Sequence, residues 1–271
     1  MSHWGAFHLS TEIWGASQLS LYQRNGYLVV HDIIPREKLW RLCQDISRMA
    51  VLKTKHVFGE PGDLDLDTNV AKLDLFDSAH AVELISAAGR LHSFLSITTL
   101  PELRSIACFL LGTSDLFLSA SSLRYDAPGA DHYLIPWHQD YPFIQDSEKS
   151  VVVWFPLLDF APECGGVRIL PESNQEGIRK VRQKENWLEL AGPIESVPRS
   201  SIVPHLGAGD VLFMDTLTIH RSEANRGTSI RWTGQFRIGD YAHPRAVERG
   251  WPRGMTMGQH FREYHEEFIV D

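Results

Sequence analysis

The sequence predicts a mainly β protein with a helical N-terminal part (α+β), in which helices pack on a small β-barrel. Two observations carry this prediction. Residues 1–115 contain apolar side chains at helical spacing, whereas residues 116–240 contain many short β-type runs separated by Gly, Pro and Asp turns. Strands without intervening helices form antiparallel sandwiches or barrels. No linker separates the two parts, so we expect a single domain over residues 1–271.

The N-terminal part is predicted to form a helical buttress for the strands. Residues 1–16 show no clear periodicity, but Leu39, Leu42 and Ile46 recur at helical spacing. Thr99-Leu100-Pro101-Glu102 is a capping-box pattern that opens a helix. The elements expected here are a helix ending at Gly26, a strand at 27–30, a helix from Pro35, a strand at 70–76, and helices at 77–97 and 99–112.

Residues 53–68 are predicted to form a lid-like loop within the buttress. They contain Gly59, Pro61 and Gly62 together with four acidic residues. A loop of this length in a compact domain is often a lid over a site, and the alternative is a surface excursion without function.

The barrel strands are expected in the second part of the chain. They lie at 116–118, 151–157, 167–170, 201–203, 211–214 and 229–238. A charged insertion at 173–195 interrupts the series and is predicted to be partly helical around 181–190. Residues 241–271 are predicted to form a C-terminal tail.

Charge and cysteine content limit the class of protein. The chain has 26 Lys and Arg against 34 Asp and Glu, a net charge of −8, so we expect no nucleic-acid or anionic-membrane partner. Its three cysteines form no CxxC motif. The N-terminus lacks a signal-peptide pattern, and no run approaches the ~18 apolar residues of a membrane span. We therefore expect a cytoplasmic protein, either monomeric or homodimeric.

The segment Trp137-His138-Gln139-Asp140-Tyr141 contains the first candidate metal ligands. On a strand, side chains at i and i+2 leave the same face, so His138 and Asp140 could lie side by side. A second histidine would complete the facial triad of two His and one carboxylate that binds ferrous iron. Alone the pair is weak, because 13 His and 34 acidic residues produce such pairs by chance.

His220 is the best candidate for the third ligand. Five histidines follow Asp140, and only His220 comes directly after an apolar strand and before a strand that is rich in polar groups. His205 lies in a Pro/Gly turn, and the other three histidines lie in the tail. On spacing alone, an ordinary surface or core histidine remains the alternative.

The strand at 231–237 alternates polar and apolar residues. Arg231, Thr233, Gln235 and Arg237 share one face, and Trp232 and Phe236 share the other. In a barrel with a functional lumen the polar face points inward, and two arginines there would suit a ligand with carboxylate or phosphate groups. The alternative is a solvated edge face.

Taken together, these motifs resemble the phytanoyl-CoA dioxygenase family. The resemblance rests on His138-Gln139-Asp140, on His220 with Ser222 and Asn225, and on Arg231 eleven residues after that histidine. It extends to the Gly-Gly turn at 164–173, where Glu172 stands in place of the usual glycine, and covers roughly residues 20–240. The family implies a double-stranded β-helix (jelly-roll, cupin-like) and dependence on iron(II), 2-oxoglutarate and dioxygen.

The resemblance also implies roles for individual residues. Iron would be held by His138, Asp140 and His220. The residues implied to bind 2-oxoglutarate are Arg231, which would pair with its distal carboxylate, Ser222, Lys72 and Trp154. A core position for Trp154 and a surface position for Lys72 are the alternatives.

The expected activity is hydroxylation of a small molecule with release of succinate and CO2. A carboxylate at Asp140 separates the chain from related halogenases, where a small residue leaves a site for chloride. Arg237 and Arg168 are candidate anchors for an anionic substrate, or structural ion-pair partners. The substrate could be a natural product, an amino-acid or sugar derivative, or an acyl thioester. A cupin-like metal enzyme without 2-oxoglutarate and a silent binding module are the alternative functions.

Overall fold

The core of the molecule is an antiparallel sheet of five strands. The structure, a computed structural model, describes residues 15–60, 62–63, 65–184, 187–192, 200–256 and 258–270. In spatial order the strands are β1 (Tyr27–Val30), β7 (Val211–Asp215), β3 (Ser150–Pro156), β9 (Arg231–Asp240) and β2 (Leu116–Asp126). Strand β3 is buried along its whole length, as expected for a central strand covered on both faces.

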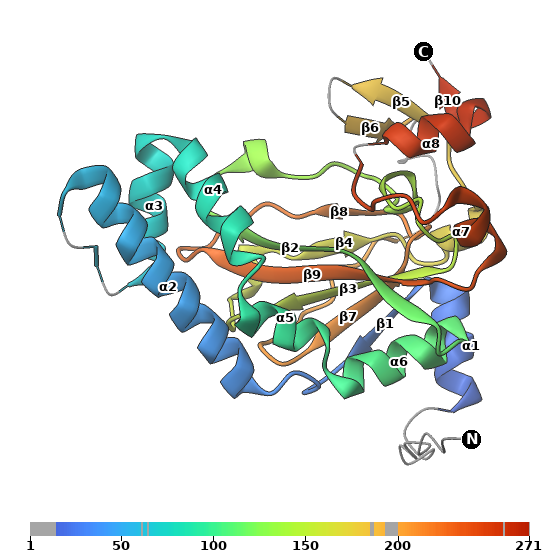
Figure 1. The fold of residues 1–271 in the computed structure, drawn as a ribbon, viewed down its shortest axis with the longest axis horizontal. Helices are drawn as coiled ribbons and strands as arrows, with labels where there is room; N and C mark the ends of the chain where they lie inside the picture. Colours follow the sequence, from blue (N-terminus) through green and yellow to red (C-terminus); the bar gives the residue numbers. More distant parts are fainter. Residues whose placement is uncertain are drawn as a thin grey trace.

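Helices cover one face of this sheet (Figure 1). They are α1 (Ala16–Asn25), α2 (Arg36–Phe58), α3 (Leu66–Phe76), α4 (Ser78–Ala88), α5 (His92–Thr98) and α6 (Pro101–Leu111). Because neighbouring residues of a strand point to opposite faces, Val151, Val153 and Phe155 pack among the helices in the largest core cluster. The predicted helical buttress is confirmed in this arrangement.

A second, smaller layer packs on the other face. Strands β4 (Val167–Ile169) and β8 (His220–Ser222) pair antiparallel, and single bridges join His138 to His220 and Ile202 to Ile169. Trp154 of β3 packs in one apolar cluster with Ile169 of β4. Only Ile202 of the strand expected at 201–203 pairs, through that bridge. The two layers confirm the mixed α and β architecture.

Two predictions for the N-terminal part are wrong. Residues 53–58 are the last turns of α2, which ends at Gly59 in the left-handed conformation, so the predicted lid-like loop is mostly helical. The strand expected at 70–76 is helix α3, because Asp65 caps its start and Val70 and Leu73 are buried at helical spacing. Positions 61 and 64 of the predicted loop lie outside the described residues. The helix expected at 77–97 is interrupted at 89–91 and forms α4 and α5.

The insertion at 173–195 contains strands where a partly helical segment was expected. Strands β5 (Val181–Lys184) and β6 (Trp187–Leu190) pair antiparallel, and the buried residues of β6 alternate rather than recur at helical spacing. Positions 185–186 and 193–199 lie outside the described residues. The segment expected as a tail contains α7 (Pro244–Arg249), α8 (Gln259–Tyr264) and β10 (Ile269–Val270).

Strand β10 pairs parallel with β5, so the insertion and the end of the described chain share one three-stranded sheet. We call this sheet, β5–β6–β10, the roof. It lies at the upper right of Figure 1, apart from the helices that cover the five-stranded sheet. Phe261 of α8 is fully buried in a cluster with Val181 and Leu188 of the roof.

Within the described residues, no single helix is long and apolar enough to cross a membrane. The bent pair α5–α6 meets the length and composition criteria together. Both helices pack into the core, where Phe94 and Leu103 are fully buried.

Candidate metal centre

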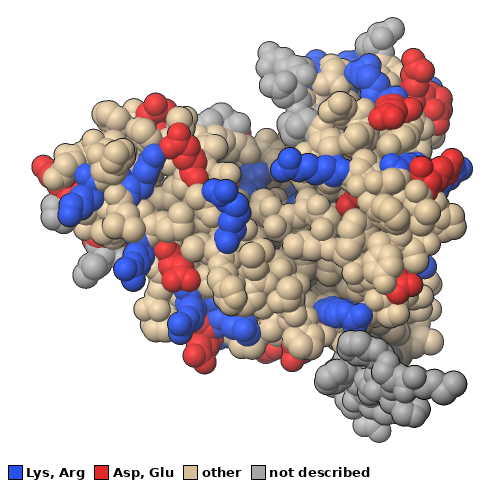
Figure 2. Space-filling view, viewed as in Figure 1, with Lys and Arg blue, Asp and Glu red and all other residues tan. Residues whose placement is uncertain are grey.

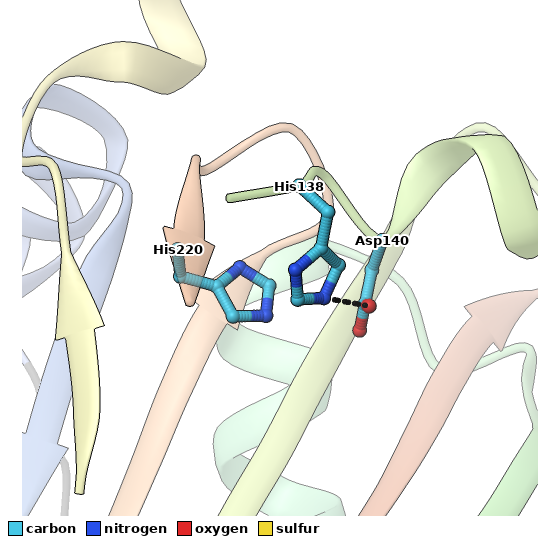
Figure 3. A group of neighbouring side chains, drawn as sticks. All are labelled: His138, Asp140 and His220. Carbon is cyan, nitrogen blue, oxygen red and sulfur yellow. Dashed lines mark ion pairs between the residues drawn. The ribbon is translucent and has the colours of Figure 1, made fainter. Parts of the chain in front are cut away.

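His138, Asp140 and His220 come together in a buried cluster between the two layers (Figure 3). One ligand atom from each residue lies within 4.8 Å of the others. His138 Nε2 lies 3.4 Å from Asp140 Oδ1, and the two imidazole ring centroids are 4.2 Å apart. The three residues predicted as a facial triad are therefore brought together by the fold.

Backbone pairing places the two histidines on one face. The amide of His138 donates to the carbonyl of His220 at 2.9 Å, and the reverse bond measures 3.0 Å. Residues paired in this way in an antiparallel bridge point their side chains the same way. The expectation that His138 and Asp140 share a strand is wrong, because His138 takes part only in this single bridge. Asp140 has helical backbone angles, and the chain continues into a 3-10 turn at Tyr141–Phe143.

Both imidazoles have one nitrogen fixed by a backbone carbonyl. His138 Nδ1 lies 2.8 Å from the oxygen of Pro136, and His220 Nδ1 lies 2.9 Å from the oxygen of Thr218. A carbonyl can only accept, so Nδ1 carries a proton and Nε2 is the nitrogen that can bind a metal. Burial, and then the neighbouring His138, lower the pKa of His220 to about 4, which keeps the ring neutral.

Arg237 orients the carboxylate of the cluster. Its Nε and Nη2 donate to the same oxygen, Asp140 Oδ2, at 2.9 and 2.7 Å, and both side chains are buried. Oδ1 is left to face His138. Burial alone would raise the pKa of Asp140, but the Arg237 guanidinium and the two histidines hold it well below its usual range. Arg237 is thus a partner of a metal ligand, one of the two alternatives that the sequence left open.

The cluster opens into a small cavity of about 70 Å³, which we call the metal cavity. Its walls include Arg231, Thr233, Gln235 and Arg237 of β9, so the prediction that this face points inward is confirmed. Ser222 and Trp154 also line the cavity, as the family resemblance implies. From the roof, Trp187 stacks on Phe143 with ring centroids 4.3 Å apart and meets the edge of His138 at 5.6 Å.

Arg231 lies at the other end of β9 and is 2 % exposed. Its Nη2 lies 3.1 Å from Asp126 Oδ2, which belongs to the residue directly opposite on β2. Nη1 donates to the carbonyls of Cys164 and Glu223. A Cβ at Gly165 would lie 2.8 Å from Nη1, so the glycine of the Gly-Gly turn makes room for this guanidinium.

Two predicted site residues lie elsewhere. Lys72 is on α3, half-exposed, 3.8 Å from a carboxylate oxygen of Glu60 and 4.4 Å from the ring centroid of Phe58. Arg168 is held by two hydrogen bonds to Glu223, at 2.7 and 3.1 Å, and does not line the metal cavity. Each takes the surface or ion-pair role that was the alternative, because helix α3 and the outer face of β4 point these side chains away.

Two residues of the cavity wall, Arg124 and Asp126, were not predicted from the sequence. Arg124 donates to Asp126 at 2.7 Å, so Asp126 is shared by Arg124 and Arg231. Both sit on β2, which was expected to end at 118 and continues to Asp126. Their i, i+2 spacing was the signal that could have found them.

The donor set suits ferrous iron and an anionic chelator. Two imidazoles and one carboxylate form the facial triad of non-haem iron enzymes. Among the described residues, Arg231 Nε, Thr233 Oγ1 and Arg237 Nη1 are buried without a hydrogen-bond partner. All three belong to side chains that line the metal cavity. Such orphaned groups cost about 1–3 kcal/mol each, so the cavity fits a ligand rich in acceptor oxygens, such as a dicarboxylate.

Comparisons with known proteins identify the family of the chain. A family model described as phytanoyl-CoA dioxygenase (PhyH) matches residues 22–233. Peroxisomal phytanoyl-CoA dioxygenase of Homo sapiens is 22% identical over 240 residues, which cover 83% of this chain and 68% of that protein. The Mus musculus protein is 23% identical over 239 residues, with the same coverage of 83% and 68%.

Solved structures share the fold at low identity. The non-haem α-ketoglutarate-dependent carbocyclase SnoK from nogalamycin biosynthesis superposes with a TM-score of 0.56 at 18% identity, over 85% of each chain. The epimerase SnoN, in complex with Fe3+, α-ketoglutarate and nogalamycin RO, gives 0.56 at 15% identity over 86% of this chain and 87% of that one. EctD from S. alaskensis, with 2-oxoglutarate and 5-hydroxyectoine, gives 0.56 at 17% identity over 85% and 77%.

Proposed function

The chain belongs to the phytanoyl-CoA dioxygenase family and is an oxidoreductase that depends on iron(II) and 2-oxoglutarate; we propose that it hydroxylates a small organic molecule. Substrate, 2-oxoglutarate and dioxygen are consumed, and hydroxylated substrate, succinate and CO2 are released. The observation that carries the proposal is the buried triad beside orphaned donors of Arg231 and Arg237. A double-stranded β-helix core, built from the five-stranded sheet and the smaller layer, belongs to the same proposal.

In this proposal each wall of the metal cavity has a separate task. Bound iron(II) with 2-oxoglutarate supplies the activation of dioxygen that protein side chains lack. Nε2 of His138, Nε2 of His220 and Oδ1 of Asp140 would hold the metal, and Arg237 holds Asp140 Oδ2 through two hydrogen bonds. Trp187 covers His138 and limits the access of water.

Arg231, with Ser222 nearby, receives the distal carboxylate of 2-oxoglutarate. Two arginines, Arg124 and Arg231, share the single carboxylate of Asp126, which leaves one net positive charge at this end of the cavity. A guanidinium binds a carboxylate through a planar pair of N–H donors. The Nε of Arg231 is free for this purpose.

The substrate is proposed to be a small natural product or an amino-acid or sugar derivative. The related structures support this range, because they include proteins of nogalamycin biosynthesis and one solved with 5-hydroxyectoine. Hydroxylation is preferred to halogenation because Asp140 fills the position of the third ligand. A cytoplasmic location and a monomeric or homodimeric state remain predictions.

The anaerobic complex with iron(II) and 2-oxoglutarate tests the proposal directly. A chelate at this type of site should give a weak visible band near ~500 nm. We expect Arg231→Ala to weaken 2-oxoglutarate binding about 10- to 100-fold, since a charged hydrogen-bonded contact contributes about 1.5–3 kcal/mol. Arg168→Ala is the matched control and should bind normally, because Arg168 lies outside the metal cavity.

Wild-type affinity in Arg231→Ala would refute the assignment of 2-oxoglutarate to this end of the cavity. In that case a metal enzyme of cupin type that does not use 2-oxoglutarate becomes the better account. A screen of small molecules that reads succinate, with a mass gain of one oxygen in the organic product, then identifies the substrate and the reaction outcome.

A further inference from the structure

A second cavity of about 450 Å³ lies beside the metal cavity, between α4 and β2. Arg124 lines both cavities. Ser122 lines the second cavity and accepts a hydrogen bond at 3.0 Å from Gln235, which lines the first. The wall between them therefore consists of a few side chains from adjacent strands. Figure 2 shows this region as a hollow near the centre of the molecule, with basic side chains at its floor and edge.

Part of the wall of the second cavity is apolar, and hydrogen bonds hold its two tyrosines in place. Val82 and Ile85 of α4 face Leu123 on β2, and two tyrosines complete the wall. Tyr125 and Tyr133 both donate their hydroxyl hydrogens to Asp74 of α3, at 2.8 and 3.2 Å. What they offer a ligand is therefore mainly ring surface.

The charged groups of this cavity are all basic. Arg90 and Arg124 line it, and none of its described lining residues is acidic. Arg124 is engaged with Asp126 and with the carbonyl of Tyr133. Arg90 follows the C-terminal end of α4 and is exposed, and it makes no ion pair with any described residue. One cation at the mouth is thus available to a ligand.

The two cavities differ in volume, and only the larger one has the volume of a typical small-molecule site. The metal cavity holds about 70 Å³, whereas the second, at about 450 Å³, falls within the roughly 300–1,000 Å³ typical of small-molecule sites. An organic substrate must place its reacting carbon toward the triad while most of its body lies elsewhere. The second cavity is the adjoining space for that body, and the side chains of Ser122, Arg124 and Gln235 between the two cavities must move aside for a substrate placed there to reach the triad.

We infer that the cavity between α4 and β2 binds the organic substrate, and that this substrate is a compact amphipathic anion. Its ring or branched apolar body lies against Val82, Ile85 and Tyr125, and its carboxylate or phosphate group pairs with Arg90. The inference rests on the proposed function, since it names the substrate class of the same enzyme. It also restricts size, because a long nucleotide-bearing ester would extend beyond the cavity.

Two fluorescent probes that differ by one anionic group test the substrate class. 8-Anilino-1-naphthalenesulfonate and N-phenyl-1-naphthylamine share the same ring body, and only the first carries a sulfonate. We expect the metal-free protein to bind the sulfonate more tightly. Arg90→Gln should weaken the sulfonate about fivefold and leave the neutral probe unchanged, as one half-solvated ion pair predicts. Arg41→Gln, an exposed arginine of α2 outside the cavity, should change neither.

A bulky residue at the cavity wall tests the location. Val82 and Val247 are similarly exposed, at 51% and 52%, and only Val82 lines the cavity. Val82→Trp should weaken both probes, whereas Val247→Trp should weaken neither. Equal binding of the two probes, or equal effects of Arg90→Gln and Arg41→Gln, would overturn the anionic class. Unchanged binding in Val82→Trp would overturn the cavity itself.

Quenching of the probe fluorescence by cobalt(II) tests whether the probe lies close to the metal centre. Co(II) bound at the triad absorbs visible light and should quench a probe in the adjoining cavity, and His220→Ala should abolish both the cobalt band and the quenching. A cobalt band without quenching would place the probe elsewhere and refute the inference. Anion-selective binding that depends on Arg90, in a protein that shows no cobalt band, would instead count against the proposed metal centre.

Discussion

Replacing Arg237 by lysine tests whether the metal ligand Asp140 needs the shape of the guanidinium or only its positive charge. The guanidinium fixes Asp140 through two N–H donors on one oxygen, at 2.9 and 2.7 Å, in a site where both side chains are buried. Lysine keeps the charge but loses the planar fork. We expect Arg237→Lys to bind Co(II) or Mn(II) about 10- to 100-fold more weakly, the usual effect of losing a group that orients a metal ligand.

Replacing Arg237 by methionine removes the charge as well. At 2.7 Å and an effective dielectric constant of ~20, the gross attraction between Arg237 and Asp140 is roughly 6 kcal/mol, part of which is offset by desolvation of both groups. Breaking a buried pair from one side typically costs about 3–5 kcal/mol, and we expect this loss in the metal-free protein. A divalent cation compensates the stranded carboxylate, so added metal should restore part of the stability.

The assays are titration with Co(II), followed by visible absorbance, and urea unfolding with and without metal. Arg168→Lys is the control, because its partner Glu223 lies outside the metal cavity and both side chains are partly exposed. Wild-type metal affinity in Arg237→Lys would refute the orienting role. An unchanged free energy of unfolding in metal-free Arg237→Met would show that the ion pair does not hold Asp140.

Three further predictions follow from single residues. The pKa of His220 is about 4 in the folded protein and ~6.5 in the unfolded chain, so the unfolded state binds more protons between these two pH values. The free energy of unfolding of the metal-free protein should therefore fall as the pH drops from 6.5 to 4, by up to about 3 kcal/mol. Urea titrations across this range should give a flatter profile for His220→Gln. Glu172 has a left-handed backbone conformation (φ 64°) at the position where the family resemblance implies glycine. Glycine adopts this conformation without strain, so Glu172→Gly should raise the free energy of unfolding by about 0.5–1 kcal/mol. A lower melting temperature in this variant would contradict the prediction. Burial, followed by the charge of Asp67, raises the pKa of Cys43 to about 11. Iodoacetamide at pH 8 should therefore modify Cys43 at least ~100-fold more slowly in the folded than in the urea-unfolded protein, because less of the thiol is ionised. Peptide mass spectrometry would measure the two rates.

The metal centre could be predicted because its chemistry depends on residue type and on strands with clear boundaries. His220 follows the apolar strand β7, and Arg231 begins a strand whose alternation places four polar residues on one face. These patterns are local, so they can be recognised in the sequence without knowledge of the tertiary fold. Gly165 of the Gly-Gly turn was also part of the predicted pattern, and its lack of a side chain lets Arg231 reach the Cys164 carbonyl.

The errors came from short apolar segments whose type is decided by tertiary contacts. Residues 70–76 satisfy a strand pattern, but the cap at Asp65 and burial of Val70 and Leu73 against α2 and α4 select a helix. Lys72 is carried to the surface by that helix. The insertion was ambiguous for the same reason. Strand β6 is formed by pairing with β5, and β5 in turn pairs with β10, whose Ile269 lies opposite Val181, 88 positions earlier (269 − 181).

The parallel pairing of β10 with β5 sets an order of events during synthesis. His138, Asp140 and His220 are all made before residues 269–270, and β5 lacks its β10 neighbour until those residues emerge. Because chains begin to fold while they are being translated, the five-stranded sheet can assemble around the triad while the roof is still incomplete. Iron would then enter a nascent site that is more open than the finished one. Deleting residues 266–271 should recreate this open stage in the mature protein, with faster metal exchange and greater access of water to the triad.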